Sequence, residues 1–347
     1  MKRVTIQDVA AAAGVSYQTV SRVINDRPDV AEETRRRVWQ VIEELGYQPS
    51  AIARSLVSKR THTLGLITAD FSDYFFSQVI VGAEVEARKQ GYFFMLCSTE
   101  RNPADEPEYL RLLTERQVDG ILFARPSTEE DSRHIVSLIQ QGVPLVTTAY
   151  WLPGEKLTVV DVDNVDGGLQ ATECLIELGH REIGMITGPA GWKSVNERTG
   201  GYKLALEKAG ISFDVSLIEH GDWSYQSGYV AMGRLLAKAP QITALFAQND
   251  QIAIGAMRGL REAGRRIPDD VALVGYDDIP AAAYCHPPLT TIRQPMQQVG
   301  EVATQLLIEY INDSTAEREE VLLKTELIRR GTCGSRHGLD RKGPQSQ

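Results

Sequence analysis

The sequence predicts an all-α domain at the amino terminus, followed by a larger α/β body of two lobes, each built on a doubly wound parallel sheet. Apolar residues recur at helical spacing through residues 5–46. From Thr63 onward, short apolar runs instead alternate with amphipathic segments, as in parallel strands covered by helices on both faces. The alternation occurs in two runs of similar size, so we expect two lobes with a cleft between them.

Capping residues and a turn glycine predict the first two helices. Thr5 is followed three residues later by Asp8, a capping-box pattern at a helix start. Gly14 ends this helix, because glycine adopts a left-handed backbone at low cost. Ser16 caps a second helix, on which Val20 faces inward. Two short helices joined in this way predict a helix-turn-helix, which meets DNA bases through the start of its second helix.

The exposed face of the second helix carries side chains suited to reading bases. Arg22 can pair with O6 and N7 of guanine, Gln18 can pair with a base edge, and Tyr17 offers an amphipathic ring. Short polar side chains nearby suit phosphate oxygens, which fix the register on DNA. The other candidate DNA contacts in residues 1–48 are Thr5, Ser16, Thr19, Ser21, Asn25, Thr34 and Tyr47. A third helix is expected over Ala31–Gly46. The alternative to a DNA-binding head is an ordinary three-helix domain with a polar face.

Residues 49–61 are predicted to form a hinge helix and linker. Pro49 and Ser50 provide a stop and a cap, and a helix of about two turns follows. Such a helix is too short to be stable alone, since roughly 12–15 residues are needed in water. We expect it to form against its symmetry mate in a homodimer on DNA, with Ala53 and Leu56 as candidate contacts. Leu56 would then open a base step in the minor groove; a plain linker with an incidental leucine is the alternative.

The distribution of charge fits this division. Residues 1–60 contain ten Lys or Arg and seven Asp or Glu, a net charge of +3, whereas the whole chain carries −9. The remainder therefore carries −12. A basic head on an acidic body attracts nucleic acid at the head alone, and its binding should weaken steeply with salt.

The body is expected to span residues 62–331, and residues 332–347 to form a disordered tail. The tail is polar and glycine-rich and has no heptad stripe, which disfavours a tetramer. The expected strands are 64–68, 93–96, 120–123, 144–147, 183–186, 244–247 and 271–274. The expected helices are 76–90, 106–116, 131–141, 167–178, 194–208, 226–237 and 251–262.

Polar residues just after strands or at helix starts are the candidate ligand contacts, because ligands bind outside the carboxyl ends of strands in such sheets. These residues are Arg198, Trp223, Asn249, Asp277 and Gln294. The polar groups can form paired hydrogen bonds with adjacent hydroxyls, and Trp223 offers a flat face to a sugar ring. With one cation and one anion the set is neutral, which favours a sugar over an acid or phosphate. Taken singly, Arg198 could instead form a salt bridge, Asp277 a turn, and Trp223 part of the core.

Several motifs together resemble the LacI/GalR family of bacterial transcription regulators. They are Val4-Thr-Ile-Gln-Asp-Val-Ala10, Gly14-Val-Ser-Tyr-Gln-Thr-Val-Ser-Arg-Val-Ile-Asn25, Leu45-Gly-Tyr-Gln-Pro49 and Ala53-Arg-Ser-Leu56. The resemblance runs to about Gly331. It implies a periplasmic-binding-protein-like effector domain and a near-palindromic operator on double-stranded DNA. Tyr17, Gln18 and Arg22 are similar to the reading helix of the lactose-repressor branch.

The same resemblance implies a small-molecule effector in the cleft. Arg198-Thr-Gly-Gly-Tyr202, Asn249-Asp250 and Gly275-Tyr-Asp-Asp278 are similar to the family's effector-contacting motifs, and Trp223 and Gln294 lie where the lactose-repressor branch contacts sugar. Phe75 or Phe76 is expected to close the pocket from the first lobe. One departure leaves the type of sugar open. That branch has a carboxylate after the fourth strand, whereas this chain has Leu145-Val-Thr-Thr-Ala-Tyr150.

Two other classes of protein remain as alternatives. A periplasmic sugar-binding protein would need an export signal, whereas this chain starts with a polar segment that leads into the helical head, so we expect a cytoplasmic protein. An enzyme acting on sugars would need catalytic residues, and we find neither a phosphate-binding loop nor a nucleophile elbow. Cys97, Cys174, Cys285 and Cys333 are isolated. We therefore expect no cofactor, metal, catalytic residue or membrane span. The expected function is repression of a sugar-utilisation operon under the control of a sugar.

Overall fold

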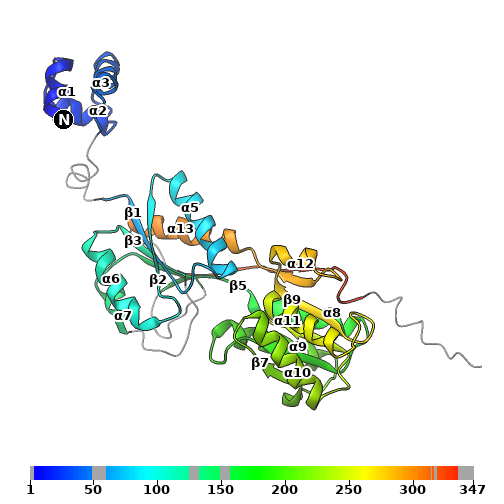
Figure 1. The fold of residues 1–347 in the computed structure, drawn as a ribbon. Helices are drawn as coiled ribbons and strands as arrows, with labels where there is room; N and C mark the ends of the chain where they lie inside the picture. Colours follow the sequence, from blue (N-terminus) through cyan, green and yellow to red (C-terminus); the bar gives the residue numbers. More distant parts are fainter. Residues whose placement is uncertain are drawn as a thin grey trace, which may run out of the picture. The chain divides into compact units, whose positions relative to one another are not determined.

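The computed structural model describes residues 4–48, 60–124, 133–148, 157–313, 315 and 319–334 (Figure 1). The chain divides into two compact units, Met1–His62 and Thr63–Gln347. The predicted hinge helix falls on residues 49–59, which lie outside the described residues together with Ala53 and Leu56.

The first unit contains the three predicted helices, α1 (Ile6–Ala13), α2 (Tyr17–Ile24) and α3 (Glu32–Leu45). Their core is formed by side chains from all three helices: Val9, Ala10, Ala13, Val20, Val23, Val38 and Ile42. The loop before α3 is fixed by Arg35, which donates to Asp26 Oδ1 at 2.5 Å and to the carbonyl of Arg27 at 2.7 Å. Arg35 is therefore a structural residue of the head.

The second unit contains two sheets, as the alternating pattern predicts, and each has six strands, more than the seven predicted strands could supply (Figure 1). The first sheet has the order β11-β5-β4-β3-β1-β2, and all its strand pairs are parallel. Its strands are β1 (Thr63–Thr68), β2 (Phe93–Ser98), β3 (Gly120–Ala124), β4 (Leu145–Thr148), β5 (Thr158–Val162) and β11 (Glu320–Leu323). Its helices are α5 (Tyr74–Lys89), α6 (Glu106–Glu115, after the 3₁₀ turn Pro103–Asp105), α7 (Arg133–Gln140) and α13 (Met296–Asn312).

The second sheet has the order β12-β10-β9-β8-β6-β7, and only β12 pairs antiparallel among the pairs described. Its strands are β6 (Ile183–Thr187), β7 (Ile218–His220, after the 3₁₀ turn Val215–Leu217), β8 (Ala244–Ala247), β9 (Ala272–Asp277), β10 (Thr290–Arg293) and β12 (Glu326–Ile328). Its helices are α8 (Asn164–Glu177), α9 (Lys193–Lys208), α10 (Tyr225–Lys238), α11 (Asp250–Glu262) and α12 (Pro280–Tyr284).

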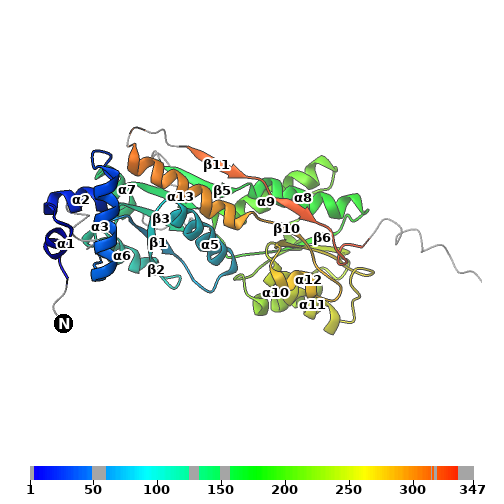
Figure 2. The same cartoon turned by 90° about the horizontal axis from the view of Figure 1, so that it is seen from above.

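Each sheet has helices on both faces, so two apolar cores flank it. In the first lobe, α5 and α13 pack on one face and α6 and α7 on the other. In the second, α8 and α9 cover one face and α10 and α11 the other. Figure 2 shows α13 beside α5. The two helices approach so closely that a Cβ on Gly82 would collide with the backbone of Gln297.

The chain passes between the lobes three times, which the sequence analysis did not predict. It leaves the first lobe after β5, returns from β10 to α13, and crosses again between β11 and β12. The strands of 3–5 residues at these crossings lack the long apolar runs that marked the other strands. The carboxyl ends of β5, β9 and β10 are therefore close to the crossings, which places their last residues beside the cleft.

The boundary of the predicted tail at residue 332 is wrong. Thr332 is fully buried, accepts from the amide of Thr290 at 2.8 Å and donates to the carbonyl of Leu273 at 2.7 Å. Cys333 is also buried. These side chains fill the end of the second sheet, so the folded body extends to Gly334. Residues 335–347 lie outside the described residues.

Candidate functional site

The start of α2 is built as the sequence predicted. Ser16 caps the helix by accepting from the amide of Thr19 at 3.1 Å. Thr5 and Asp8 form a complete capping box on α1. Gly14 has a φ of 64° at the end of α1, the left-handed conformation that the turn requires. The motif thus fixes the backbone from which the reading side chains extend.

The side chains of α2 that are predicted to read bases are exposed. Tyr17 is 56% exposed, and Gln18 is also exposed. Arg22 forms a single exposed ion pair with Asp29, at 3.0 Å. Such an exposed pair contributes little, so it would not hold the guanidinium away from another partner.

The other candidate DNA contacts in the head divide into two groups. Ser16, Thr19 and Asn25 already make hydrogen bonds within the head; Asn25 Nδ2 donates to the carbonyl of Ser21 at 2.7 Å. Thr34 and Tyr47 are partly buried, and Tyr47 packs against the core of the head. The structure places all of them in the head, and their contact with DNA remains a prediction.

The residues singled out for the effector line one cleft between the lobes of the body. This cleft contains about 590 Å³ of empty space, which includes volume open to solvent. Its lining includes all of Phe75, Phe76, Arg198, Trp223, Asn249, Asp277 and Gln294. The sequence did not single out the remaining lining residues, Asp73, Asp161, Val162, Asn164, Trp192, Lys193 and Ser194.

Arg198 and Trp223 line the cleft from the second lobe. The guanidinium carbon of Arg198 lies 3.7 Å from the centre of the Tyr276 ring and 5.7 Å from that of Trp223. Its Nε donates to Asn164 Oδ1 at 2.9 Å, and Nη1 donates to the carbonyl of Gln248 at 2.5 Å. The salt bridge considered as an alternative for Arg198 is not formed within the described residues.

Trp223 is 7% exposed and has a φ of 74°, unusual for a bulky residue. Such strained backbone persists only where its surroundings over-determine it, as at ligand sites. Asn249 Nδ2 donates to the Trp223 carbonyl at 3.1 Å, and Asn249 Oδ1 accepts from the amide of Ile252 at 2.8 Å. Gly188 leaves room for the indole ring, because a Cβ there would overlap it. Asn249 and Gly188 therefore hold Trp223 in place.

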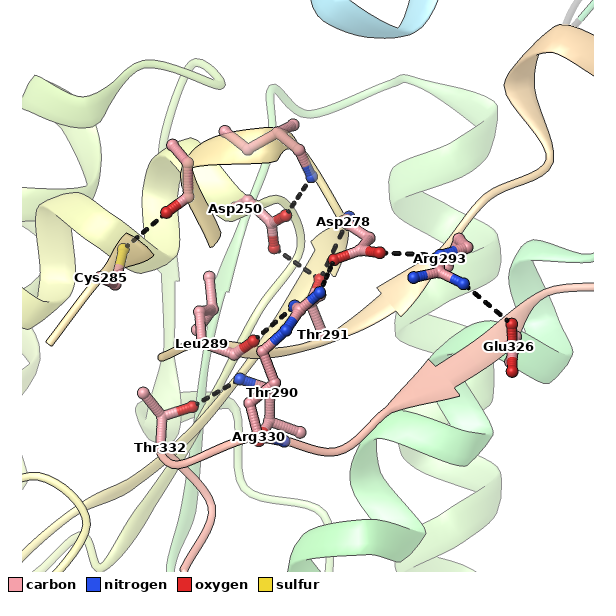
Figure 3. A network of polar contacts seen from close by, with 12 residues as sticks. Asp250, Asp278, Cys285, Leu289, Thr290, Thr291, Arg293, Glu326, Arg330 and Thr332 are labelled. Carbon is pink, nitrogen blue, oxygen red and sulfur yellow. Dashed lines mark hydrogen bonds and ion pairs between the residues drawn. The ribbon is translucent and has the colours of Figure 1, made fainter. Parts of the chain in front are cut away.

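Asp277 lies at the end of β9 on a strained turn. Asp277 has a φ of 113° and Asp278 a φ of 55°. Figure 3 shows how the turn is held: Asp278 pairs with Arg293 at 2.7 Å and with Arg330 at 2.6 Å. The amide of Ile279 donates to Asp250 Oδ2 at 2.8 Å. This network fixes the backbone that presents the Asp277 carboxyl to the cleft.

Burial raises the pKa of Asp277 to about 7, an effect that Arg198 opposes and the Asp73 carboxylate reinforces. Gln294 Nε2 donates to Asp277 Oδ1 at 2.6 Å. Two buried polar atoms of the cleft, Gln294 Oε1 and Trp223 Nε1, have no hydrogen-bond partner within the described residues. An acceptor and a donor left open in this way suit a hydroxyl group, which can serve as either.

The first lobe contributes aromatic rings and a carboxylate. Asp73 caps α5 by accepting from the amides of Phe75 at 2.9 Å and Phe76 at 3.4 Å, and it pairs with Arg101 at 3.3 Å. The Phe75 and Phe76 rings meet edge to face at 5.3 Å. On the second lobe, the Trp192 and Trp223 rings lie 5.6 Å apart. Aromatic rings thus line both sides of the cleft.

Some of the missed lining residues had a usable signal. Lys193 begins α9 after a glycine-rich turn that follows a predicted strand, so it obeys the rule that ligands lie beyond strand ends. Asp161 lies within β5, a strand that the sequence did not reveal, so it had no such signal. Asp161 also gives the first lobe a lining carboxylate. The lactose-repressor branch instead has a carboxylate in the segment that follows β4. In this chain that segment lies outside the described residues.

The described residues contain neither a candidate metal site nor a candidate membrane span. No group of three or more His, Cys, Asp or Glu side chains there could hold a metal ion. None of the helices described is both long and apolar enough to cross a membrane.

Comparison with known proteins identifies the family. Residues 5–50 match the family model of bacterial regulatory proteins of the lacI family, and residues 172–333 match a periplasmic binding protein-like domain. The regulator CelR of Thermobifida fusca is 40% identical over 334 residues, 94% of this chain and 97% of that protein. The chain belongs to the LacI family of transcription regulators. The HTH-type transcriptional repressor PurR of Aliivibrio fischeri strain MJ11, 38% identical over 96% of this chain and 99% of that protein, supports the assignment.

Solved structures agree with this LacI-family assignment. A CelR–cellobiose complex has a TM-score of 0.74 and 37% identity, covering 95% of this chain and all of the other. The lac repressor dimer bound to operator and the anti-inducer ONPF has a TM-score of 0.86 and 29% identity, covering 96% of this chain and all of the other. Like these relatives, this LacI-family protein is a DNA-binding transcription regulator rather than an enzyme.

Proposed function

We propose that this LacI-family regulator represses a sugar-utilisation operon, and that a neutral sugar bound between its lobes changes its affinity for the operator. The observation that carries the sugar proposal is the composition of the cleft. Aromatic rings from both lobes suit the C–H faces of a sugar ring, and the open polar atoms of Trp223 and Gln294 suit its hydroxyls. The CelR relative crystallised with cellobiose makes a disaccharide the first ligand to test.

The effector contacts follow from the placement of the side chains. Arg198 and Asp277 would bind hydroxyls as donor and acceptor, and Trp223 would stack on the ring. Gln294 would bind a further hydroxyl, and Phe75 would close the cleft from the first lobe. Asn249 has both functional groups engaged already, so its contribution would be chiefly to hold Trp223.

The head would bind a near-palindromic operator through α2. Arg22 and Gln18 would read base edges, Tyr17 would add apolar contact, and Ser16, Thr19, Ser21, Asn25 and Thr34 would meet phosphates. Thr5 and Tyr47 would support the same surface. Leu56, with Ala53, would enter the minor groove at the centre of the operator. The support is the exposed reading face and the likeness to the operator-bound lac repressor.

A homodimer is proposed because the body exposes apolar side chains on an edge strand. On β2, Phe93 is 71%, Met95 38% and Leu96 48% exposed, and Val81 on α5 is 44% exposed. On α12, Tyr284 is 88% exposed. Exposed edges and apolar patches usually mark contact surfaces, and the similar lac repressor is a dimer in its solved structure. A second copy would bring two heads onto two half-sites. Because its target is chromosomal DNA, the protein would act in the cytoplasm.

Fluorescence anisotropy with a labelled operator tests the proposal. The operator is first selected from random duplex DNA by the purified protein, and then compared with a scrambled duplex at fixed salt. We expect selection of a near-palindrome and an affinity for it roughly 10³-fold or more above the scrambled duplex. Cellobiose, other neutral mono- and disaccharides and, for contrast, nucleobases are then added. Equal affinity for both duplexes would reject operator recognition. If operator affinity changed with nucleobases and with none of the sugars, the proposal of a sugar effector would be rejected.

A further inference from the structure

The lining of the cleft holds more carboxylates than cations. Asp73, Asp161 and Asp277 line it, against Lys193 and Arg198. The two cations are the groups that could bind a phosphate or carboxylate on a ligand. Whether they are available decides whether an anionic sugar can bind.

Lys193 is already committed to two carboxylates. Its Nζ lies 2.8 Å from Asp161 Oδ2 and 2.8 Å from Glu197 Oε1. An ammonium group has three N–H donors, so two of the three are directed at these partners. Burial alone would lower the pKa of Lys193, but the Asp161 and Glu197 carboxylates raise it above its usual value. Lys193 therefore stays charged and paired.

Both partners of Lys193 are themselves held in place. The Asp161 side chain is 3% exposed, and its Oδ1 accepts from the amide of Val162 at 2.8 Å. Glu197 Oε2 accepts from Asn164 Nδ2 at 3.2 Å. Rotating either carboxylate away from Lys193 would break these bonds as well.

The Asp161–Lys193 pair also joins the two lobes. Asp161 lies on β5 of the first lobe, and Lys193 is the first residue of α9 in the second. A ligand anion that competed for Lys193 would have to separate this ion pair across the cleft. Anion binding would thus oppose the lobe arrangement that forms the site.

Arg198, the other lining cation, faces the Asp277 carboxyl, whose pKa it lowers against the effect of burial. Two of its donors are used by Asn164 and the Gln248 carbonyl. Its remaining donors suit a hydroxyl, whereas a phosphate there would meet Asp277 and Asp73. Burial raises the pKa of both carboxyls, so it is their ionised fraction, which grows with pH, that would repel the phosphate.

We propose that Asp161 and Glu197 withhold the Lys193 ammonium group from ligands, so that the cleft selects a neutral sugar over its phosphorylated or carboxylated counterpart. Asp161 and Glu197 are thus specificity-determining residues, and the inference rests on the sugar effector proposed above. Asp161 acts from one lobe and Glu197 from the other.

The test compares matched neutral and anionic sugars. Wild-type protein, Asp161→Asn, Glu197→Gln and the control Glu207→Gln, an exposed position on the same helix, are titrated with cellobiose and cellobiose 6-phosphate, and with glucose and glucuronate. Calorimetry reports affinity, and operator anisotropy reports the response. We expect wild type and Glu207→Gln to prefer the neutral member by roughly tenfold or more. In Asp161→Asn and Glu197→Gln, anion binding should strengthen and this ratio should fall.

A gain of anion binding cannot result from misfolding, and one further variant identifies its source. In Glu197→Gln combined with Lys193→Met, the gained anion affinity should disappear, because the released cation is gone. The inference is overturned if wild type binds the anionic member as tightly as the neutral one, or if both single variants keep the wild-type ratio. If wild type binds an anionic sugar that alters operator affinity, control of the operator by a sugar survives and the selectivity for a neutral sugar fails. If none of the four sugars binds, this inference is rejected together with cellobiose as the effector, whereas operator recognition is judged by its own anisotropy test.

Discussion

Arg22 in the head and Arg198 in the body are both proposed to bind a ligand, yet the protein holds them in opposite ways. The Arg22 side chain is 59% exposed and makes one ion pair, with the equally exposed Asp29. Arg198 is 6% exposed, packs on the Tyr276 ring and donates to Asn164 and to the Gln248 carbonyl. One side chain is free to adjust, and the other is fixed before any ligand arrives.

The difference follows from the size of the two ligands. A duplex supplies many contacts of its own and orders exposed side chains as it binds. A small sugar makes few contacts, so the free energy they provide would be offset by the cost of ordering a flexible site. Its site must therefore be pre-organised. Substitutions in the reading face should therefore affect DNA binding alone. Substitutions in the cleft should affect folding and effector binding together.

The largest expected effect is that of Arg198→Ala. The change removes a buried cation, takes its donor from the Gln248 carbonyl and leaves Asn164 Oδ1 with the longer bond from the Tyr276 hydroxyl at 3.4 Å. The cost should be on the order of 3 kcal/mol of stability. Effector binding should be lost as well. Urea denaturation and calorimetry with cellobiose measure the two effects. If Arg198→Ala were as stable as the wild type, Arg198 would not be part of the protein core, and the contrast with Arg22 would fail.

Arg22→Ala should lower operator affinity by about 1–3 kcal/mol, the usual value of a bidentate contact with guanine. Stability should change by less than about 0.5 kcal/mol, because the side chain is exposed. Anisotropy against operator and against an operator altered at single bases gives the result. Unchanged operator affinity, or a large loss of stability, would remove the distinction between the two arginines.

Gly188→Ala tests whether Trp223 must lie where it does. The added Cβ would overlap the indole ring, so overpacking should cost about 1–3 kcal/mol and weaken effector binding. Gly200→Ala on α9 is the matched control, since its Cβ would meet no atom within 4 Å and alanine favours a helix. Denaturation and sugar titration of the two variants should diverge; equal behaviour would show that the ring can move freely.

Taken per pH unit, the effect of pH on the cleft is the smallest expected one. Because burial raises the pKa of Asp277 to about 7, the folded chain holds a proton that the unfolded chain releases above about pH 4. Stability should therefore fall as pH rises through this window, by no more than about 1.4 kcal/mol per pH unit, and level off above it. Asp277→Asn should show a shallower slope in denaturation at pH 5, 6 and 7. Burial also raises the pKa of Asp73 and Asp250, so some slope should remain.

The head could be predicted almost completely from the sequence, because its information is local. Thr5, Gly14 and Ser16 each determine a cap or a turn within four residues of themselves, and the structure shows the helices they predict. Most strands of the body were equally readable as apolar runs. Strands β5, β7, β10, β11 and β12 were missed because their runs are short or broken by polar residues, such as Asp161.

The cleft was only half predictable. Arg198, Trp223 and Asp277 follow strands or begin helices, and the structure brings them to one surface. Which residues face them from the first lobe depends on three crossings between the lobes, which no local pattern specifies. The pairing of Asp161 with Lys193 is of this kind, since its members are 32 positions apart and lie on different lobes.

The coupling between cleft and head is the central claim, and thermodynamic reciprocity tests it most directly. Cellobiose affinity is measured by calorimetry for the free protein and for the protein saturated with operator. We predict that operator changes cellobiose affinity by roughly 5- to 150-fold, and that cellobiose changes operator affinity by the same factor. Cellobiose that binds with one affinity, whether or not operator is present, would contradict the account.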